Sequence, residues 1–178
     1  MAPIARLTEI ADSGRALAEA EAIFWESAGT KTFPDEAARA AFHDLWFGRY
    51  ARHAPDEFLL ALGPDLAVQG YLAGALVSDA PPLPGPDYYP LFPPELIARF
   101  PAHIHVNIRE GLRGGGIGGG LVEAFARHCR ERDIPGFHAV TAAGSRSAAF
   151  FAKCGLMPIA EAPWRSRRLA FLARSITG

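Results

Sequence analysis

Two histidines stand close together in the segment AHIHVNI, at His103 and His105. The segment predicts a strand, and side chains two positions apart on a strand point to the same face. An imidazole, whose ordinary pKa is about 6.5, can take up or release a proton near neutral pH. The pair therefore indicates either acid–base chemistry or two packed histidines bonded to neighbouring backbone. Because no third ligand is evident beside them, we expect no metal.

Directly after this segment comes a run of glycines, in RGGGIGGG from Arg113 to Gly120. Each glycine in a helix interior costs about 1 kcal/mol relative to alanine, so the run needs a compensating reason. At the start of a helix the backbone N–H groups lack partners, and glycines let them curl around an anion in the field of the helix dipole. A tight, closely packed turn would explain some of the glycines but hardly all of them. The run therefore predicts a phosphate-binding turn, to which Arg113 adds a positive charge.

Two common kinds of phosphate-binding turn do not fit the run. A Walker A loop ends in G-K-[ST], whereas this run ends GGGLVE. The pattern G-x-G-x-x-G occurs at Gly114, Gly116 and Gly119, but any glycine run contains it by accident. A dinucleotide site also needs an acidic residue roughly 20 positions on, where this chain has HAVTAAGS. We therefore exclude a Walker A (P-loop) nucleotide-binding site and disfavour a nicotinamide-cofactor oxidoreductase.

The composition indicates one ordinary globular domain over residues 1–178, with 49% hydrophobic and 21% charged residues. The net charge of −1 gives no basic field for nucleic acid or an anionic membrane, so we expect neither partner. The chain shows no signal-peptide pattern and no apolar stretch of the roughly 20 residues that span a membrane. Cys129 and Cys154 form no C-x-x-C pair, and we expect small buried thiols in a cytoplasmic protein.

The periodicity of the chain predicts one mixed α/β sheet with the element order β-α-α-β-β-β-α-β-α-β-β. Asp12 or Ser13 is expected to cap the first helix, and Pro34 to lie in the first turn of the second. A proline-rich segment from 80 to 101 interrupts the pattern and contains one short helix. The expected strands are 4–10, two runs flanking Gly63–Asp65, 103–108, 136–142, 156–163 and 167–176; the expected helices are 14–29, 34–53, 121–133 and 145–155.

Aromatic residues gather in two places. Asp87, Tyr88 and Tyr89 lie in the proline-rich segment, where they either line a pocket for a substrate or anchor the loop by packing. The first two helices carry a second group at helical spacing, for which a place in the core is the default: Phe24, Trp25, Phe42, Trp46 and Phe47.

The pattern R-x-x-G-x-G is filled by Arg113, Gly116 and Gly118. Together with the element order, it resembles the GNAT superfamily of acetyl-CoA-dependent N-acetyltransferases over nearly the whole chain. The segments YPLFP and FPAHIHVNI are also similar to the acetyltransferase-like domain associated with O-GlcNAcases. The resemblance implies the GNAT (acyl-CoA N-acyltransferase) fold and acetyl-CoA as co-substrate, without a metal.

The resemblance further implies transfer of an acetyl group to a primary amine by direct attack of the amine on the thioester. The acceptor would be a small-molecule or peptide amine, and because family members are often dimers a homodimer is one expected state. His105, and after it His103, would be the general base, since their strand often supplies the base or its water relay in the family. The pantetheine arm would pair with the backbone of Val106, Asn107 and Ile108, and the pyrophosphate would lie on the amides of Gly114, Gly115, Gly116, Ile117, Gly118 and Gly119 beside Arg113.

The chain departs from the family pattern in two places, the helix that follows the fifth strand and position 107. The helix GSRSAAFFAKCGL has Phe151 where the family commonly has a tyrosine that protonates the leaving CoA thiolate, and Gly144 where it has an asparagine. Asn107 stands where the related subgroup often has an aspartate. Both departures favour the alternative hypothesis, a non-catalytic acyl-CoA-binding module with the same fold.

Overall fold

The computed structural model describes residues 2–176 and confirms the predicted mixed α/β fold and its element order. The chain forms two compact units. The first comprises the residues up to Gly74 together with 105–125, and the second comprises 75–104 and the residues from 126 onward. The single domain expected for residues 1–178 stays a prediction.

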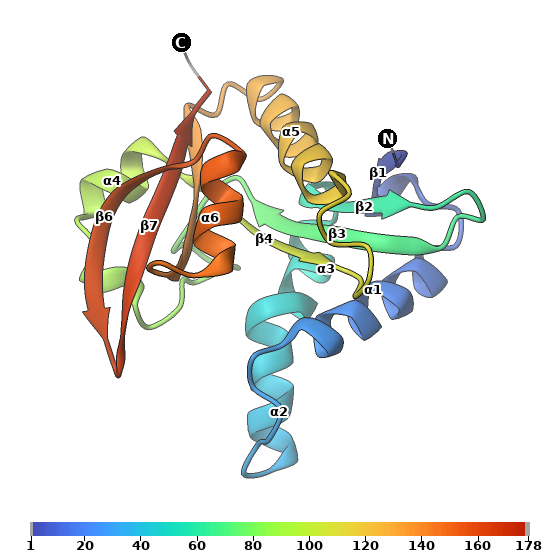
Figure 1. The fold of residues 1–178 in the computed structure, drawn as a ribbon, viewed down its shortest axis with the longest axis horizontal. Coiled ribbons are helices and arrows are strands. Elements are labelled where there is room, and N and C mark those ends of the chain that lie inside the picture. Colours follow the sequence, from blue (N-terminus) through green and yellow to red (C-terminus); the bar gives the residue numbers. More distant parts are fainter. Residues whose placement is uncertain (1, 177–178) are drawn as a thin grey trace. The chain divides into compact units, whose positions relative to one another are not determined.

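The first unit contains three antiparallel strands and the second half of a fourth (Figure 1). Pairing of β1 with β2 brings Ile4 opposite Ala61, and the β2–β3 turn closes with a hydrogen bond from the Gly63 N–H to the Ala67 carbonyl at 2.8 Å. This hairpin is the one predicted around Gly63–Asp65. The strands are β1 (Ile4–Arg6), β2 (Phe58–Leu62), β3 (Val68–Ala75) and β4 (Ala102–Ile108).

The predicted first strand, 4–10, is wrong in its second half, where the structure has a 3-10 turn, η1 (Leu7–Glu9). The physical reason is local: the Glu9 carboxylate accepts a hydrogen bond from the Arg6 N–H at 2.8 Å. Such a side-chain acceptor competes with strand pairing for the backbone donor, and it turns the chain toward the first helix.

Helices cover both faces of these strands, with α1 to α3 on one side and α5 on the other (Figure 1). Asp12 caps α1 as predicted, accepting from the Arg15 N–H at 3.0 Å. The second helix begins later than expected because Asp35 is its cap, so Pro34 precedes the helix. The bounds are α1 (Ser13–Ser27), α2 (Glu36–His43), the π-helical segment η2 (Asp44–Gly48), α3 (Arg49–His53), the 3-10 turn η3 (Pro55–Glu57) and α5 (Ile117–Arg130).

Aromatic packing joins the α1–α3 layer to the strands. Phe47 meets Phe58 and Tyr71 edge-on, with ring centroids 5.4 Å apart in both pairs. Phe58 and Tyr71 are in turn stacked at 5.3 Å. Because all three rings are almost completely buried, they hold the π-helical segment firmly on β2 and β3.

The second unit orders its strands β4-β5-β7-β6, where β4 and β5 are parallel and the other pairs antiparallel. The register of β4 with β5 covers Ala102 and His103, opposite Phe137 and His138. Counted over residues 2–176, the two units contribute seven strands. The remaining bounds are β5 (Gly136–Ala142), α6 (Arg146–Lys153), β6 (Met157–Trp164), β7 (Arg167–Ser175), α4 (Pro94–Arg99) and the 3-10 turn η4 (Tyr89–Leu91).

The proline-rich segment is ordered by its tyrosines. Tyr89 is buried and its hydroxyl lies 3.0 Å from Nε2 of His138, while Tyr88 meets Trp164 edge-on with ring centroids 5.7 Å apart. Asp87 is exposed and paired with Arg165 at 3.3 Å. Of the two roles expected for these tyrosines, the structure therefore supports anchoring of the loop.

Two further expectations concern membrane-spanning helices and the burial of the cysteines. Among the helices of residues 2–176, none is long and apolar enough to cross a membrane. Cys129 is buried and Cys154 is half-buried.

His138 is a buried histidine that the fold keeps neutral. Its Nδ1–H donates to the Phe100 carbonyl at 2.7 Å, its Nε2 accepts from Tyr89, and its ring stacks on Phe171 at 4.4 Å. Burial lowers the pKa of His138 to about 4. In the unfolded chain the same imidazole titrates near its ordinary value of about 6.5, so unfolding takes up a proton between these two pH values.

We therefore predict that the free energy of unfolding falls as pH drops from about 6.5 to about 4, with His138 contributing about 1.4 kcal/mol per pH unit. Urea denaturation at pH 7, 6 and 5 measures the slope, and the His138→Gln variant should lack this contribution. His53→Gln, at an exposed position, is the matched control and should keep the wild-type slope. Equal slopes for the wild type and the His138→Gln variant would contradict the prediction.

Candidate functional site

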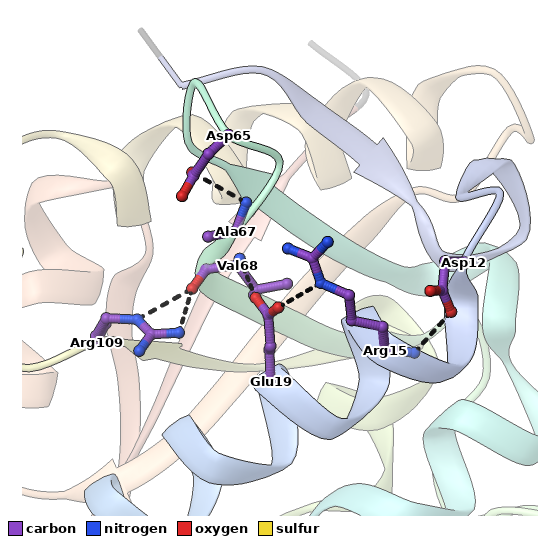
Figure 2. A network of polar contacts seen from close by, with 7 residues as sticks. All are labelled: Asp12, Arg15, Glu19, Asp65, Ala67, Val68 and Arg109. Atoms are coloured by element: carbon purple, nitrogen blue, oxygen red, sulfur yellow. Dashed lines mark hydrogen bonds and ion pairs between the residues drawn. The ribbon is translucent and has the colours of Figure 1, made fainter.

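Polar contacts to the backbone of Val68 help to hold the chain in place at the end of β4 (Figure 2). The Glu19 carboxylate of α1 accepts from the Val68 N–H at 2.7 Å. The Arg109 guanidinium, just after β4, donates to the Val68 carbonyl from Nε at 3.1 Å and from Nη2 at 2.8 Å. Val68 therefore ties the start of β3 both to α1 and to the point where the chain leaves β4.

Glu19 is ionised in this arrangement. The hydrogen bond from the Val68 N–H, followed by that from Arg15 at 2.9 Å, lowers the pKa of the Glu19 carboxyl below its ordinary value (Figure 2). A charged acceptor makes a stronger hydrogen bond than a neutral one. The contact between α1 and β3 is therefore one of the stronger polar contacts of the first unit.

The turn that follows β4 rests against the C-terminal end of α1. The Glu110 N–H donates to the Glu26 carboxylate at 2.6 Å. Arg113 is exposed, and its guanidinium donates to the Ser27 hydroxyl and to the Ile108 carbonyl, both at 3.3 Å. These long contacts orient Arg113 across the turn and leave its charge in solvent.

Close packing does not explain the glycine run. Gly114 and Gly116 have φ angles of +88° and +84°, which L side chains rarely adopt, so the backbone requires glycine there. Among residues 114, 115, 116, 119 and 120, only at Gly120 would an added Cβ come within 3.4 Å of another group, namely the Ile4 side chain at 3.3 Å. At Gly119 a Cβ would meet nothing within 4 Å. The turn consequently presents its main chain to open space.

Helix α5 begins inside the glycine run, at Ile117, four residues earlier than predicted. The Gly120 N–H bonds to the Gly116 carbonyl at 3.0 Å, which closes the first helical turn. The N–H groups of Ile117, Gly118 and Gly119 belong to this first turn, where no carbonyl of the same helix can accept from them. Such amides, in the positive field of the helix dipole, can hold a phosphate group.

Successive residues of β4 direct their backbone N–H and carbonyl groups to opposite edges of the strand. The Arg109 N–H donates to the Gln69 carbonyl at 3.0 Å, so alternate residues back along the strand also direct their backbone groups to β3. Val106 and Ile108 direct theirs to the opposite edge. The close approach of β3 to this part of β4 depends on Gly70, where a Cβ would lie 2.5 Å from the Ile108 side chain and 3.0 Å from the Asn107 carbonyl oxygen.

Two β4 side chains on one face are held by tyrosines. His105 is half-buried, and its Nε2 lies 3.0 Å from the hydroxyl of Tyr50, which is only 3% exposed. Trp46 meets the His105 ring edge-on, with centroids 5.2 Å apart. Asn107 donates from Nδ2 to the Tyr71 hydroxyl at 2.8 Å, and burial raises the pKa of that phenol above its ordinary value.

His103 has a different environment, within the second unit. Its ring is buried, its Nδ1 lies 2.7 Å from the Ser78 hydroxyl, and the rings of His103 and His138 are 6.0 Å apart. These surroundings are typical of a packed histidine. The two expected bases thus share a face of β4 but differ in exposure, and the first unit contains the glycine turn together with His105 alone.

The sequence analysis did not single out Tyr50 or Tyr71. Tyr50 lies one helical turn after Trp46, a spacing that places both side chains on one face of a helix and was the available signal. Tyr71 had none beyond its place in a buried strand. Phe151, in α6, is buried against Phe150 with ring centroids 5.1 Å apart, and it has no proton to donate.

The architecture is that of the GNAT superfamily N-acetyltransferases. The crystal structure of SsHAT superposes with a TM-score of 0.69 over 99% of this chain and 98% of that one, at 20% identity. A ribosomal-protein-alanine N-acetyltransferase from Brucella melitensis superposes with a TM-score of 0.59 over 97% and 99%, also at 20% identity. A GNAT superfamily phosphinothricin acetyltransferase from Sinorhizobium meliloti, solved in complex with AcCoA, gives 0.60 over 98% and 88%, at 19% identity.

These identities show the fold and leave the activity of this chain to be argued from its site. No family model and no curated protein matches the sequence. The more specific similarity to the domain associated with O-GlcNAcases stays a prediction.

The turn geometry predicts opposite effects for two glycine substitutions. Gly116→Ala should destabilise the protein by about 1–2 kcal/mol, because its φ of +84° is unfavourable for a residue with a Cβ. Gly119→Ala should leave stability unchanged or raise it by up to about 1 kcal/mol, because the helical backbone gains propensity and the Cβ meets open space. Thermal and urea unfolding measure both, and a loss of stability at Gly119→Ala would refute this account of the turn.

Proposed function

We propose that this protein is an acetyl-CoA-dependent N-acetyltransferase that acts on a primary amine of a small molecule or peptide. The observation that carries the proposal is the turn from Arg113 to Gly119, in which residues 113–116 are exposed and lead into the N-terminus of α5 shortly after β4. The fold shared with N-acetyltransferases supports the proposal, and the phosphinothricin acetyltransferase of that fold was solved with AcCoA. The homodimer and the cytoplasmic location expected from the sequence stay predictions.

The main chain would do most of the binding of acetyl-CoA. The amides of the segment 114–119 would hold the pyrophosphate, and Arg113 would add its positive charge. The pantetheine arm would pair with the segment 106–108, chiefly through Val106 and Ile108, whose backbone groups point away from β3. The bond from Asn107 to Tyr71 would keep this part of the strand extended.

The reaction follows from the chemistry of a thioester and an amine. The amine nitrogen attacks the acetyl carbonyl carbon, the new C–N bond forms, and the C–S bond breaks with release of the CoA thiolate. The nitrogen loses one proton, which His105 would accept directly or through water. Since Phe151 has no proton to give, the thiolate, whose conjugate thiol has a pKa of about 8.5, would be protonated by solvent.

His105 suits the role of base better than His103 does. It is half-buried rather than buried, and it lies in the same unit as the glycine turn. The Tyr50 hydroxyl at its Nε2 would fix the orientation and the tautomer of the ring. His103, bonded to Ser78, would be structural.

The alternative is a non-catalytic acyl-CoA-binding module. Phe151 and Asn107 favour it, because neither supplies the acid or carboxylate that related proteins have at these positions. Both hypotheses require acetyl-CoA binding, and only the first requires release of free CoA thiol when an amine is added. A thiol-release assay over a panel of amines therefore separates them.

The binding site is tested by reversing the charge of Arg113. We expect Arg113→Glu to weaken acetyl-CoA binding by about tenfold or more, because a carboxylate would then face the pyrophosphate. The fold should survive, since Arg113 is exposed and its contacts to Ile108 and Ser27 are long, at 3.3 Å each. Isothermal titration calorimetry measures the affinity.

Arg127→Glu is the matched control for this charge reversal. It makes the same change of net charge at an exposed position on α5, the helix that follows the turn, ten residues beyond the helix start at Ile117. Its affinity for acetyl-CoA should stay close to that of the wild type. Equal affinities for the wild type and Arg113→Glu would remove the glycine turn from the proposal.

The base is tested by removing the imidazole. His105→Ala should lower the rate of acetyl transfer by about 10²-fold or more, because a positioned general base typically contributes that much. Its acetyl-CoA affinity should change little. Stopped-time thiol assays from pH 6 to 9 measure the rate, with His53→Ala as the exposed control. A rate unaffected by His105→Ala would exclude His105 from the mechanism.

A further inference from the structure

Four half-buried aromatic rings lead outward from His105 over the helices of the first unit. Trp46 meets His105 at 5.2 Å between ring centroids, and Phe42 follows at 6.5 Å from Trp46. Phe33 lies 5.2 Å from Phe42, and Trp25 lies 6.2 Å from Phe33 and 6.4 Å from Phe42, so these three rings form a cluster next to Trp46. We call these four residues, Trp46, Phe42, Phe33 and Trp25, the aromatic track.

The track lies above a core that is already filled. Phe24 and Phe47 are 4% and 2% exposed, and they occupy the space between these helices and the strands. Phe24 contacts Trp25 and Phe42 from below, with ring centroids at 4.8 and 5.8 Å. The track residues are therefore not needed to close the core, and each of the four is half-buried. Half-buried aromatic side chains gathered next to His105 indicate a binding site for an apolar group.

The charged side chains beside the outer end of the track are engaged within the protein. Lys31 donates to the Trp25 carbonyl at 2.7 Å, and the Arg39 guanidinium stacks 4.1 Å above the centroid of the Trp25 ring. Glu21 accepts from Nε1 of Trp25 at 3.3 Å. These groups shape the track rather than offer an ion pair to a ligand.

The carboxylate of Asp44 also has partners within the protein. Asp44, which stands between Phe42 and Trp46 in the sequence, pairs with Arg49 at 3.5 Å and with Arg52 at shorter range. The hydrogen bonds and charges of these arginines outweigh the opposing effect of burial and lower the pKa of the Asp44 carboxyl. Its charge is thereby balanced by arginines of the same segment.

From this arrangement we infer that the acceptor is a small arylalkylamine, that is, a primary amine joined by a short carbon chain to an aromatic ring and carrying no carboxylate. With the amine at His105, a linker of about two carbons brings the ring of the ligand over Trp46 and Phe42. The products are the N-acetylated amine and CoA thiol, and the amine loses one proton. The inference rests on the proposed function and adds the class of its acceptor.

The test compares amines with the full-length protein and acetyl-CoA, following release of CoA thiol. The probes are 2-phenylethylamine, ethylamine, phenylalanine, spermidine and the peptide amide Phe-Ala-Ala. We expect kcat/KM for 2-phenylethylamine to exceed that of each other probe by about tenfold or more, because it alone combines an aromatic ring two carbons from the amine with the absence of a carboxylate and of a peptide chain on the α-carbon.

Substitutions at Trp46 test whether the track causes the preference. Trp46→Ala should lower kcat/KM for 2-phenylethylamine by about tenfold or more, and it should change that for ethylamine much less, since ethylamine does not reach the ring. Trp46→Phe, the matched control, keeps an aromatic surface and should keep the preference. A structural role of Trp46 would instead lower both activities together, which would contradict the inference.

The outcomes separate this inference from the proposed function. Acetyl-CoA binding with preferred transfer to spermidine, phenylalanine or the peptide would overturn the arylalkylamine acceptor and leave the acetyltransferase standing. Acetyl-CoA binding without transfer to any probe would support the non-catalytic alternative and overturn the inference. Absence of acetyl-CoA binding by calorimetry would overturn both.

Discussion

The candidate site depends on the way the backbone of Val68 is shared. Its N–H is taken by the Glu19 carboxylate and its carbonyl by the Arg109 guanidinium, at 2.7 and 2.8 Å for the closest atoms. Because both partners are charged, these bonds are stronger than ordinary backbone pairing. Together with the bond from the Arg109 N–H to the Gln69 carbonyl, they hold the chain against β3 where it leaves β4, just before the glycine turn. A shift of β4 by one residue in its register with β3 would move each of its side chains to the opposite face of the sheet, and His105 would lose its contact with Tyr50.

In strand β4 the backbone groups of some residues and the side chains of the residues between them face different surroundings. The backbone of Val106 and Ile108 faces away from β3 and is suited to pairing with an extended ligand. The side chains of His105 and Asn107 point to the helical layer, where Tyr50 and Tyr71 hold them. In the proposed function, ligand binding would therefore use the main chain of this short strand and proton transfer would use its side chains, so the two would not compete for the same atoms.

Much of the fold could be predicted from local signals, such as the Asp12 cap, the hairpin around Gly63–Asp65 and the strand over 136–142. Where a side chain competes with the backbone, as Glu9 does, the periodicity misleads. The start of α5 was placed too late because glycine has low helix propensity, although helix positions in a first turn are held by the turns that follow.

Contacts across long sequence distances, such as that of Tyr50 with His105, 55 residues apart, leave no mark in a single sequence. The glycine turn was conspicuous because its composition is unusual. Tyr50, the partner of His105, was not conspicuous, because a tyrosine in a helix is common. For the same reason the sequence pointed to two candidate bases, and their different surroundings became visible only once each had its neighbours.

A turn whose exposed groups are main-chain amides also affects how the protein can diverge. Every residue type except proline carries the same N–H group, so selection on such a turn preserves backbone shape and constrains few side chains. The lineage can accumulate substitutions elsewhere while the architecture is retained, which agrees with superpositions over nearly the full chain at 20% identity or less. In such a protein the backbone geometry can stay similar after most of the amino-acid sequence has changed.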